Sequence, residues 1–290
     1  MKGKNLISPV YIPTEKLRPF EGHPYKIIDD DRMTELTESI RENGILVPLA
    51  VRPLEGTTDE YEIISGHRRW YAAQKIGKPA LLSFVFNVTH DEAAVMLVDS
   101  NMQRERILPS EKAFAYKLKL DALSRQGSRT DLTSSQTATR LDTAKEVGSA
   151  YGESRDTVYR YVRLTKLIPA FLDLMDEGRI AFSVGVELSF LDDDLQRAVL
   201  EACELNDCTP SYFQAVRMHK AANAGTLDRD GISEIMSEEK ANQRDKVRIP
   251  VDVLKGKVPE SYSEKQRQEF VVKAIEYYHR HLVRQRESAR

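Results

Sequence analysis

Strand signals end near residue 108, and this change in hydrophobic pattern constrains the fold more than any other feature of the sequence. Before it, short apolar runs such as residues 81–86 alternate with segments of helical period. After it, apolar residues recur almost only at helical spacing, as at Ala113, Tyr116 and Leu120. We therefore expect an α+β domain in residues 1–107 and an all-helical part beyond it.

Turn and capping residues mark the elements of the first domain. Asp29 to Asp31 can cap a helix that ends before Gly44, and further helices are expected after Gly66 and Thr89. Strands are expected at residues 45–52, 61–64 and 81–86, the first with an irregular start or an edge position because of its proline.

A chain of 290 residues is long enough for two or three domains. We expect an all-helical domain at 108–222 with a helix-turn-helix near 141–166, a linker at 223–262 and a C-terminal helix at 263–290. Within the helical domain, the Ser- and Thr-rich residues 128–139 predict a loop, and Pro169 and Pro210 predict first helical positions. The apolar stripe of the last helix either forms a dimer seam or packs on its own chain.

Composition excludes several classes of protein. The apolar stretches fall far short of the roughly 20 residues needed to cross a bilayer, and the N-terminus leads into no hydrophobic signal core. We therefore expect a soluble cytoplasmic protein with no membrane partner. Cys203 and Cys208 are the only cysteines, too few for a disulfide framework or for a four-ligand zinc site unless partners supply the other ligands.

The net charge of −2 hides a strong segmental pattern. Residues 101–166 carry 13 basic and 8 acidic side chains, residues 167–239 carry 5 and 15, and residues 240–290 carry 13 and 7. Two basic regions flanking an acidic one either face a polyanion or are solvated helical faces.

A strand that ends at a glycine and opens a helix with two arginines forms the first candidate site. It spans residues 63–73, and Gly66 precedes Arg68 and Arg69. Helix-start N–H groups and guanidinium groups together suit a phosphate. The alternative is that both arginines pair with nearby acids.

The second candidate site is the polar run of residues 99–106. Asn101 and Glu105 could supply oxygen atoms to a magnesium ion, and Arg104 could reach a phosphate. An N-capping asparagine with a surface ion pair explains the same residues.

The third is a helix, a turn containing Gly152 and a second helix within residues 144–164. Ser154 is the expected cap of the second helix, and Val158 and Val162 its anchors. The residues left to face DNA are Arg155, Thr157, Tyr159, Arg160 and Arg163. A structural three-helix unit with a basic surface is the alternative.

Taken together, residues 44–52, Ser65–Arg69 and Asn101–Glu105, followed by a helix-turn-helix, resemble the ParB/Spo0J/KorB family of plasmid and chromosome partition proteins. The resemblance covers roughly residues 7–205. It implies a ParB/sulfiredoxin-like domain that binds CTP and Mg²⁺ and closes a dimer into a sliding clamp on a centromere-like site in double-stranded DNA. It also implies a homodimer, a partner partition ATPase and association with the nucleoid or a plasmid.

The resemblance assigns roles to individual residues. It implies that the nucleotide is held by Gly66, His67, Arg68, Arg69, Arg104 and Glu105, and that Asn101 contacts the metal. His67, Tyr71, Val47 and Ser100 depart from the family pattern, which has Glu, Arg, Gln and Glu at these places. Because the serine cannot supply a full negative charge, we expect CTP hydrolysis to be slow or absent.

Two other functions stay open. One is a ParB-like transcriptional regulator of a plasmid or integrated element without nucleotide switching, which His67 and Ser100 favour. The other is a nucleotide-dependent kinase or a nuclease on the same fold. Sulfiredoxin, which shares this fold, needs a cysteine at the glycine turn, and neither cysteine lies near Gly66. A nuclease needs several clustered acids, which the candidate site lacks apart from Asp99 and Glu105.

Overall fold

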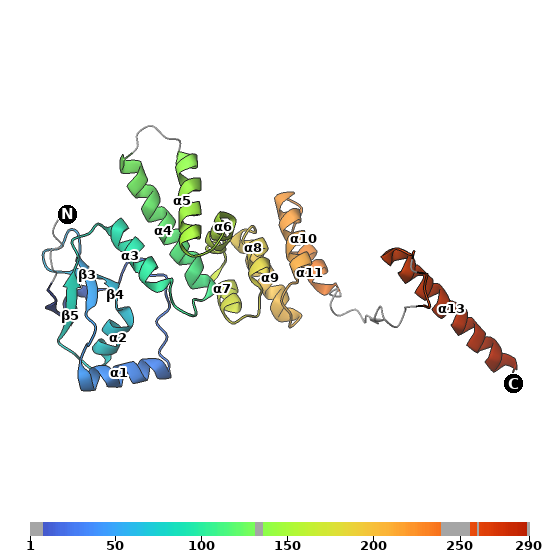
Figure 1. The fold of residues 1–290 in the computed structure, drawn as a ribbon, viewed down its shortest axis with the longest axis horizontal. Coiled ribbons are helices and arrows are strands. Elements are labelled where there is room, and N and C mark those ends of the chain that lie inside the picture. Colours follow the sequence, from blue (N-terminus) through green and yellow to red (C-terminus); the bar gives the residue numbers. More distant parts are fainter. Residues whose placement is uncertain (1–7, 131–135, 239–255, 260, 289–290) are drawn as a thin grey trace. The chain divides into compact units, whose positions relative to one another are not determined.

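The computed structural model describes residues 8–130, 136–238, 256–259 and 261–288 (Figure 1). The chain divides into two compact units, residues 1–238 and 239–290.

A mixed five-stranded sheet forms the N-terminal part of the first unit, in the order β1-β5-β3-β4-β2. β1 pairs antiparallel with β5, β5 parallel with β3, β3 antiparallel with β4, and β4 parallel with β2. The strands are β1 (Val10–Pro13), β2 (Leu17–Arg18), β3 (Leu49–Pro53), β4 (Tyr61–Ser65) and β5 (Ala80–Val85). A 3-10 helix, η1 (Thr14–Lys16), joins the first two.

Helices cover both faces of this sheet. Ile63 of β4 packs in a core with residues of α1 (Asp31–Asn43) and α2 (His67–Lys75). Its neighbour Ile64 packs on the opposite face with residues of α3 (His90–Asn101). Successive strand side chains point to opposite faces, so β4 is buried on both sides, and it leads through Gly66 into α2.

The predicted α+β class of this part is confirmed, with differences in detail. Asp30 and Thr89 cap α1 and α3 through their side chains, as expected. The strand expected at 45–52 begins only at Leu49, and Leu46 and Val47 are 76% and 63% exposed. Strands β1 and β2 were not predicted because they are too short to show an alternating pattern.

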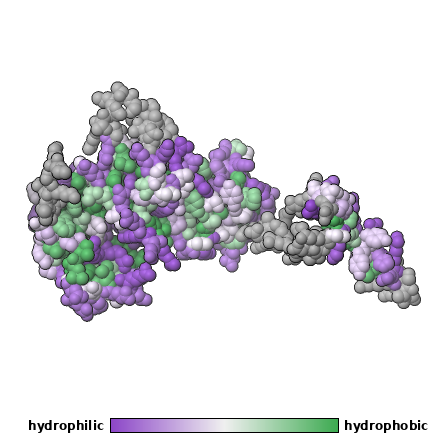
Figure 2. All heavy atoms as spheres, viewed as in Figure 1, coloured by the Kyte–Doolittle hydropathy of each residue, from purple (hydrophilic) through white to green (hydrophobic). Residues whose placement is uncertain are grey.

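The rest of the first unit is largely helical, as predicted. It contains α4 (Pro109–Thr130), α5 (Gln136–Ala150), α6 (Arg155–Leu164), α7 (Pro169–Asp176), α8 (Phe182–Leu188), α9 (Asp193–Leu205), α10 (Tyr212–Asn223) and α11 (Arg229–Ser237). Leu164, Phe171, Leu188 and Met218 are among the fully buried residues of its core. Hydrophilic side chains cover much of the face shown in Figure 2.

Two local predictions in this part were wrong. Helix α4 continues to Thr130 and α5 begins at Gln136, so helix replaces both ends of the loop expected at residues 128–139. Residues 131–135 lie outside the described part. Ser and Thr cost a helix only a few tenths of a kcal/mol, which the packing of α4 on α5 offsets. Pro210 was expected at the first position of a helix, but α10 begins at Tyr212 and is capped by the side chain of Ser211. Pro210 therefore lies before the helix.

The second unit contains α13 (Glu264–Ser288). Its side chains Phe270, Ile275 and Tyr278 are exposed. Among the described residues, no helix has the length and apolar character needed to cross a membrane.

Candidate functional site

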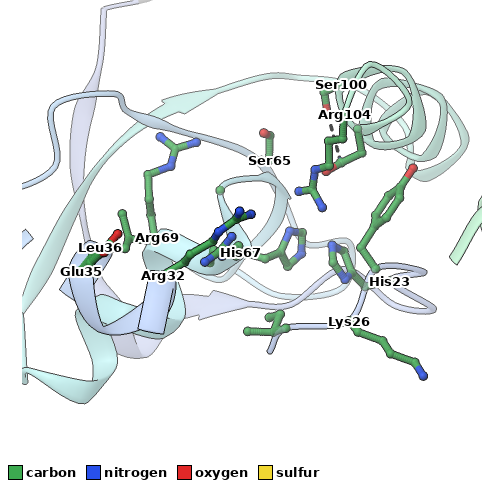
Figure 3. Close-up of a pocket in the computed structure, with 15 residues that line it drawn as sticks. His23, Lys26, Arg32, Glu35, Leu36, Ser65, His67, Arg69, Ser100 and Arg104 are labelled. Carbon is green, nitrogen blue, oxygen red and sulfur yellow. Dashed lines mark hydrogen bonds between the residues drawn. The ribbon is translucent and has the colours of Figure 1, made fainter. Parts of the chain in front are cut away.

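A cavity of about 560 Å³ opens where the end of β4, the start of α2 and the end of α3 meet (Figure 3). Its lining includes five cationic side chains, from Lys26, Arg32, Arg68, Arg69 and Arg104, against the single carboxylate of Glu35. Such an excess of positive charge in a concave site attracts a polyanion.

Gly66 lets the backbone reach this cavity at the start of α2. Its φ of +108° lies in the left-handed region, and a Cβ there would lie 2.9 Å from Leu49 Cγ. The position therefore requires glycine. The first N–H groups of α2 have no partner within the helix, so they can bond to an anion in the cavity.

The two arginines of the first turn have different surroundings. Arg68 has its Nε buried without a hydrogen-bond partner, and its Nη2 lies 3.8 Å from Asp30 Oδ1. Arg69 donates from Nη1 to the carbonyl oxygens of Val47 and, at 3.0 Å, Pro48. Burial lowers the pKa of Arg69. Thus Arg68 has bonding capacity left for a ligand, whereas Arg69 also fixes the segment before β3.

His67 lies in the cavity wall next to His23, with ring centroids 3.8 Å apart (Figure 3). His67 Nε2 accepts a hydrogen bond from the Phe20 backbone N–H at 3.2 Å. Burial lowers the pKa of His67 to about 3, with smaller contributions from His23 and Arg104, and burial lowers the pKa of His23 to about 4. Both rings are therefore neutral near pH 7, and His67 anchors the segment after β2.

The neutral His67 predicts a pH-dependent stability. In the unfolded chain a histidine takes up a proton near pH 6.5, whereas folded His67 resists it down to about pH 3. Its contribution is complete above pH 6.5 and is lost as the pH falls, by about 1.4 kcal/mol per pH unit. We expect the free energy of unfolding to fall by about 2 kcal/mol from this residue between pH 6.5 and 5.

Urea unfolding at several pH values measures this effect. His67→Gln keeps an acceptor for the Phe20 N–H but cannot titrate, so its stability should depend less steeply on pH. An identical pH slope in both proteins would contradict the assignment.

The end of α3 supplies the opposite wall. Asn101, which is 6% exposed, donates from Nδ2 to the Leu97 carbonyl oxygen at 2.7 Å, and Ser100 donates to the same oxygen at 3.0 Å. The guanidinium of Arg104 lies 5.1 Å from the centre of the Tyr25 ring. Glu105, predicted from the same run, does not line the cavity.

The cavity thus brings together Gly66, His67, Arg68, Arg69, Asn101 and Arg104 of the predicted set. No sequence motif indicated the lining residues of the segment between β2 and α1 and of α1 itself, which include His23, Tyr25, Lys26 and Arg32. Among the described residues, no group of three His, Cys, Asp or Glu side chains is arranged to hold a metal ion.

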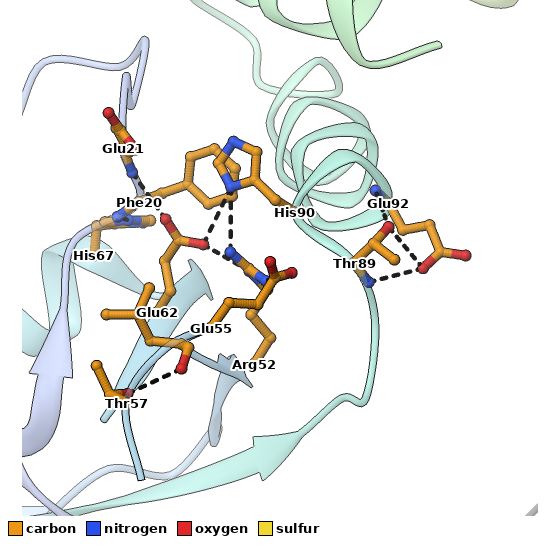
Figure 4. Close-up of polar contacts among 11 residues, drawn as sticks. Phe20, Glu21, Arg52, Glu55, Thr57, Glu62, His67, Thr89, His90 and Glu92 are labelled. Carbon is orange, nitrogen blue, oxygen red and sulfur yellow. Dashed lines mark hydrogen bonds and ion pairs between the residues drawn. The ribbon is translucent and has the colours of Figure 1, made fainter. Parts of the chain in front are cut away.

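A buried ion pair supports the cavity from the neighbouring strands (Figure 4). Arg52 of β3 donates from Nε to Glu62 of β4 at 2.7 Å, and their side chains are only 4% and 3% exposed. Glu62 also accepts from the Glu21 backbone N–H at 3.0 Å, and His90 lies within 3.5 Å of the same carboxylate. The pair therefore ties the segment after β2 to the sheet.

Helices α5 and α6 form the second candidate site, joined by a tight turn at residues 151–154. A Cβ on Gly148 would lie 2.6 Å from the Glu153 carbonyl oxygen, so this close approach needs glycine. Ser154 caps α6 by accepting from the Thr157 N–H, and Val158 is fully buried, as predicted.

The predicted DNA-facing side chains of α6 differ in their contacts. Arg155 and Arg160 are exposed, the first pairing with the adjacent Asp156. Arg163 is half-buried and donates from Nη2 to the Ser189 carbonyl oxygen at 3.0 Å. It also lies 4.0 Å from the centre of the Phe190 ring. Arg163 is therefore held against the turn after α8, which helical periodicity did not predict.

Comparisons with known proteins agree with the motifs. Residues 2–102 match the family model of the ParB N-terminal domain. The chromosome-partitioning protein Spo0J of Thermus thermophilus is 34% identical over 185 residues, which cover 64% of this chain and 61% of that protein. The probable chromosome-partitioning protein ParB of Pseudomonas putida is 31% identical over 186 residues, covering 64% and 58%.

Among solved structures, the C-terminally truncated chromosome-partitioning protein ParB from Caulobacter crescentus, complexed with CTP-gamma-S, is 25% identical. The match covers 67% of this chain and 99% of that chain, with a TM-score of 0.32. The chain spans about three fifths of the length of the two curated relatives. The N-terminal third of the chain thus matches the ParB N-terminal domain, and about two thirds of the chain is similar to ParB/Spo0J partition proteins.

Proposed function

We propose that this chain is a ParB-type partition protein that binds a centromere-like DNA site and holds CTP in the cavity beside α2. The observation that carries the proposal is the set of four arginine side chains that line the cavity beside the start of α2, where Gly66 lets a ligand approach the backbone. The names of both curated relatives favour partition over a transcriptional regulator, a kinase or a nuclease.

The donor set of the cavity fits a triphosphate. The N–H groups that follow Gly66 and the guanidinium group of Arg68 are donors that suit negative charge, and Arg104 adds a cation from the opposite wall. The segment held by His67 closes the third side.

The cavity fits Mg²⁺ less fully than it fits phosphate. A magnesium ion, when bound, neutralises phosphate charge and keeps most of its waters. Because Asn101 donates its Nδ2 to Leu97, its amide oxygen is the group left to face such an ion. Ser100 brings no carboxylate to this place, so the proposal includes slow hydrolysis of CTP at most.

Helix α6 is the proposed reader of DNA sequence in a helix-turn-helix formed with α5. Its N-terminal side chains Arg155 and Thr157 would contact base edges in the major groove, and Tyr159, Arg160 and Arg163 would lie closer to phosphates. Support comes from the buried anchor Val158, the capped start at Ser154 and the exposed arginines.

Arg155→Ala should reduce discrimination between the specific DNA site and a scrambled duplex by about 5- to 150-fold, because a bidentate contact to a base contributes about 1–3 kcal/mol. Fluorescence anisotropy with both duplexes measures this ratio. Arg160→Ala is the matched control, and it should weaken both complexes equally and lower the salt slope by about one. It is a cleaner control than Arg163→Ala, which also removes the bond to Ser189. Equal binding of both duplexes by the unaltered protein would refute sequence reading.

The proposal also includes two protein partners. One is a second copy of the chain, which binds through α13, and the other is a partition ATPase. The exposed apolar side chains of α13 support the dimer.

Crosslinking of the N-terminal domains, with CTP and specific DNA present separately and together, tests the whole proposal. A crosslink that increases only when both ligands are present supports a nucleotide-gated clamp. No dependence on CTP would leave a DNA-binding regulator without nucleotide switching. Transfer of labelled phosphate or nicking of plasmid DNA would instead indicate a kinase or a nuclease.

A further inference from the structure

Lys26 lines the cavity, but its ammonium group is bound elsewhere. Its Nζ lies 2.8 Å from Asp173 Oδ1 and 3.1 Å from Asp176 Oδ2, both on α7. Figure 3 shows the side chain extending away from the arginines of the cavity. One lysine therefore connects the wall of the cavity to a helix of the second half of the unit.

The two aspartates depend on this lysine to different extents. Asp176, whose side chain is 7% exposed, also accepts from the Ser110 backbone N–H at 3.0 Å and from its hydroxyl at 2.5 Å. Its carboxylate stays bonded if Lys26 leaves. The Asp173 and Lys26 side chains are 61% and 44% exposed, and ion pairs in such positions are weak.

Only the side chain of Lys26 has to move for the ammonium to turn toward the cavity. The Lys26 backbone N–H donates to Glu111 Oε1 at 2.8 Å, and Glu111 Oε2 accepts from the Leu108 N–H at 3.0 Å at the start of α4. These bonds hold the backbone in place. The flexible four-carbon stem of lysine lets the ammonium group move while the backbone stays in place.

We propose that Lys26 is a further phosphate-binding residue of the cavity, and that Asp173 of α7 competes with the bound polyanion for its ammonium group. This inference rests on the proposed function, since the polyanion is the triphosphate of the nucleotide. By linkage, occupation of the cavity weakens the contact between Lys26 and α7, and the charge of Asp173 weakens ligand binding by the same factor.

A double-mutant cycle on the full chain tests the competition. Calorimetric titrations with inorganic triphosphate and with CTP, both with Mg²⁺, compare the unaltered protein with Lys26→Ala, Asp173→Asn and the double variant. Asp173→Asn should tighten binding about two- to fivefold, because it removes one of the two carboxylates that hold Lys26 on α7. Lys26→Ala should weaken binding about tenfold, as expected for a lost charged hydrogen bond. The double variant should bind like Lys26→Ala alone.

Asp59→Asn is the matched control, because it removes the same charge from an exposed aspartate paired with Lys16, which does not line the cavity. Its affinity should not change. The inference is overturned if Asp173→Asn does not tighten binding, if its effect persists without Lys26, or if Asp59→Asn has an equal effect. If neither ligand binds the unaltered protein, both the proposed nucleotide binding and this inference are refuted.

Discussion

Arg68→Ala should lower the affinity of the chain for CTP and Mg²⁺ by about 10- to 100-fold, the effect of losing a hydrogen bond between charged groups. Arg68 has a buried Nε without a partner, and its nearest carboxylate, that of Asp30, lies 3.8 Å away. Its removal therefore breaks no strong bond within the protein. We expect the free energy of unfolding without ligand to stay within about 0.5 kcal/mol of the unaltered value, as for most surface substitutions.

Arg41→Ala is the matched control for that prediction. Arg41 lies near the end of α1 and pairs with Glu38 of the same helix, outside the cavity. Its substitution removes the same charge and should leave the CTP affinity unchanged. Equal affinities of the Arg68→Ala and unaltered proteins would show that the first turn of α2 does not hold the triphosphate.

Glu62→Ala should lower the free energy of unfolding by about 3–5 kcal/mol, which is the usual cost of leaving one partner of a buried ion pair without the other. Arg52 is 3% exposed and would lose its bond to Glu62. The Glu21 N–H would lose its acceptor as well. Because this bond helps to hold the segment after β2, CTP binding should weaken too. Urea unfolding followed by circular dichroism measures the loss.

Two further variants show whether the loss of stability in Glu62→Ala comes from leaving the Arg52 charge buried or from losing contacts of the Glu62 side chain. Replacing both partners by apolar residues, as in Arg52→Met with Glu62→Leu, should restore most of the lost stability, since no charge is left buried. Glu60→Ala, which breaks the exposed pair with Arg18, should cost less than about 1 kcal/mol. A loss from Glu62→Ala as small as that from Glu60→Ala would contradict the role of the buried pair.

Local signals predicted the part of the cavity that lies on contiguous elements. Gly66, Arg68 and Arg69 follow a strand and open a helix, so the sequence indicates both their structure and their charge. Asn101 and Arg104 were predicted from a polar run at the end of α3. That these two segments share one cavity depends on sheet order and helix packing, and the family resemblance, rather than periodicity, connected them.

Other features depend on contacts between distant segments and leave no local pattern. Lys26 and Arg32 look like ordinary surface cations until the fold brings them beside α2. His67 is the first residue of α2, a position that suggests phosphate binding, yet its ring accepts a hydrogen bond from the backbone N–H of Phe20, 47 residues earlier. Arg163 was expected among the exposed residues, but its guanidinium donates a hydrogen bond to the Ser189 carbonyl oxygen in the turn after α8.

A crystal structure of the chain with CTP and Mg²⁺ tests most directly whether the start of α2 binds the triphosphate. We expect phosphate oxygens within hydrogen-bonding distance of the N–H groups that follow Gly66 and of the Arg68 guanidinium, with Arg104 on the opposite side. A nucleotide bound elsewhere, or an empty cavity at saturating CTP, would contradict the proposal.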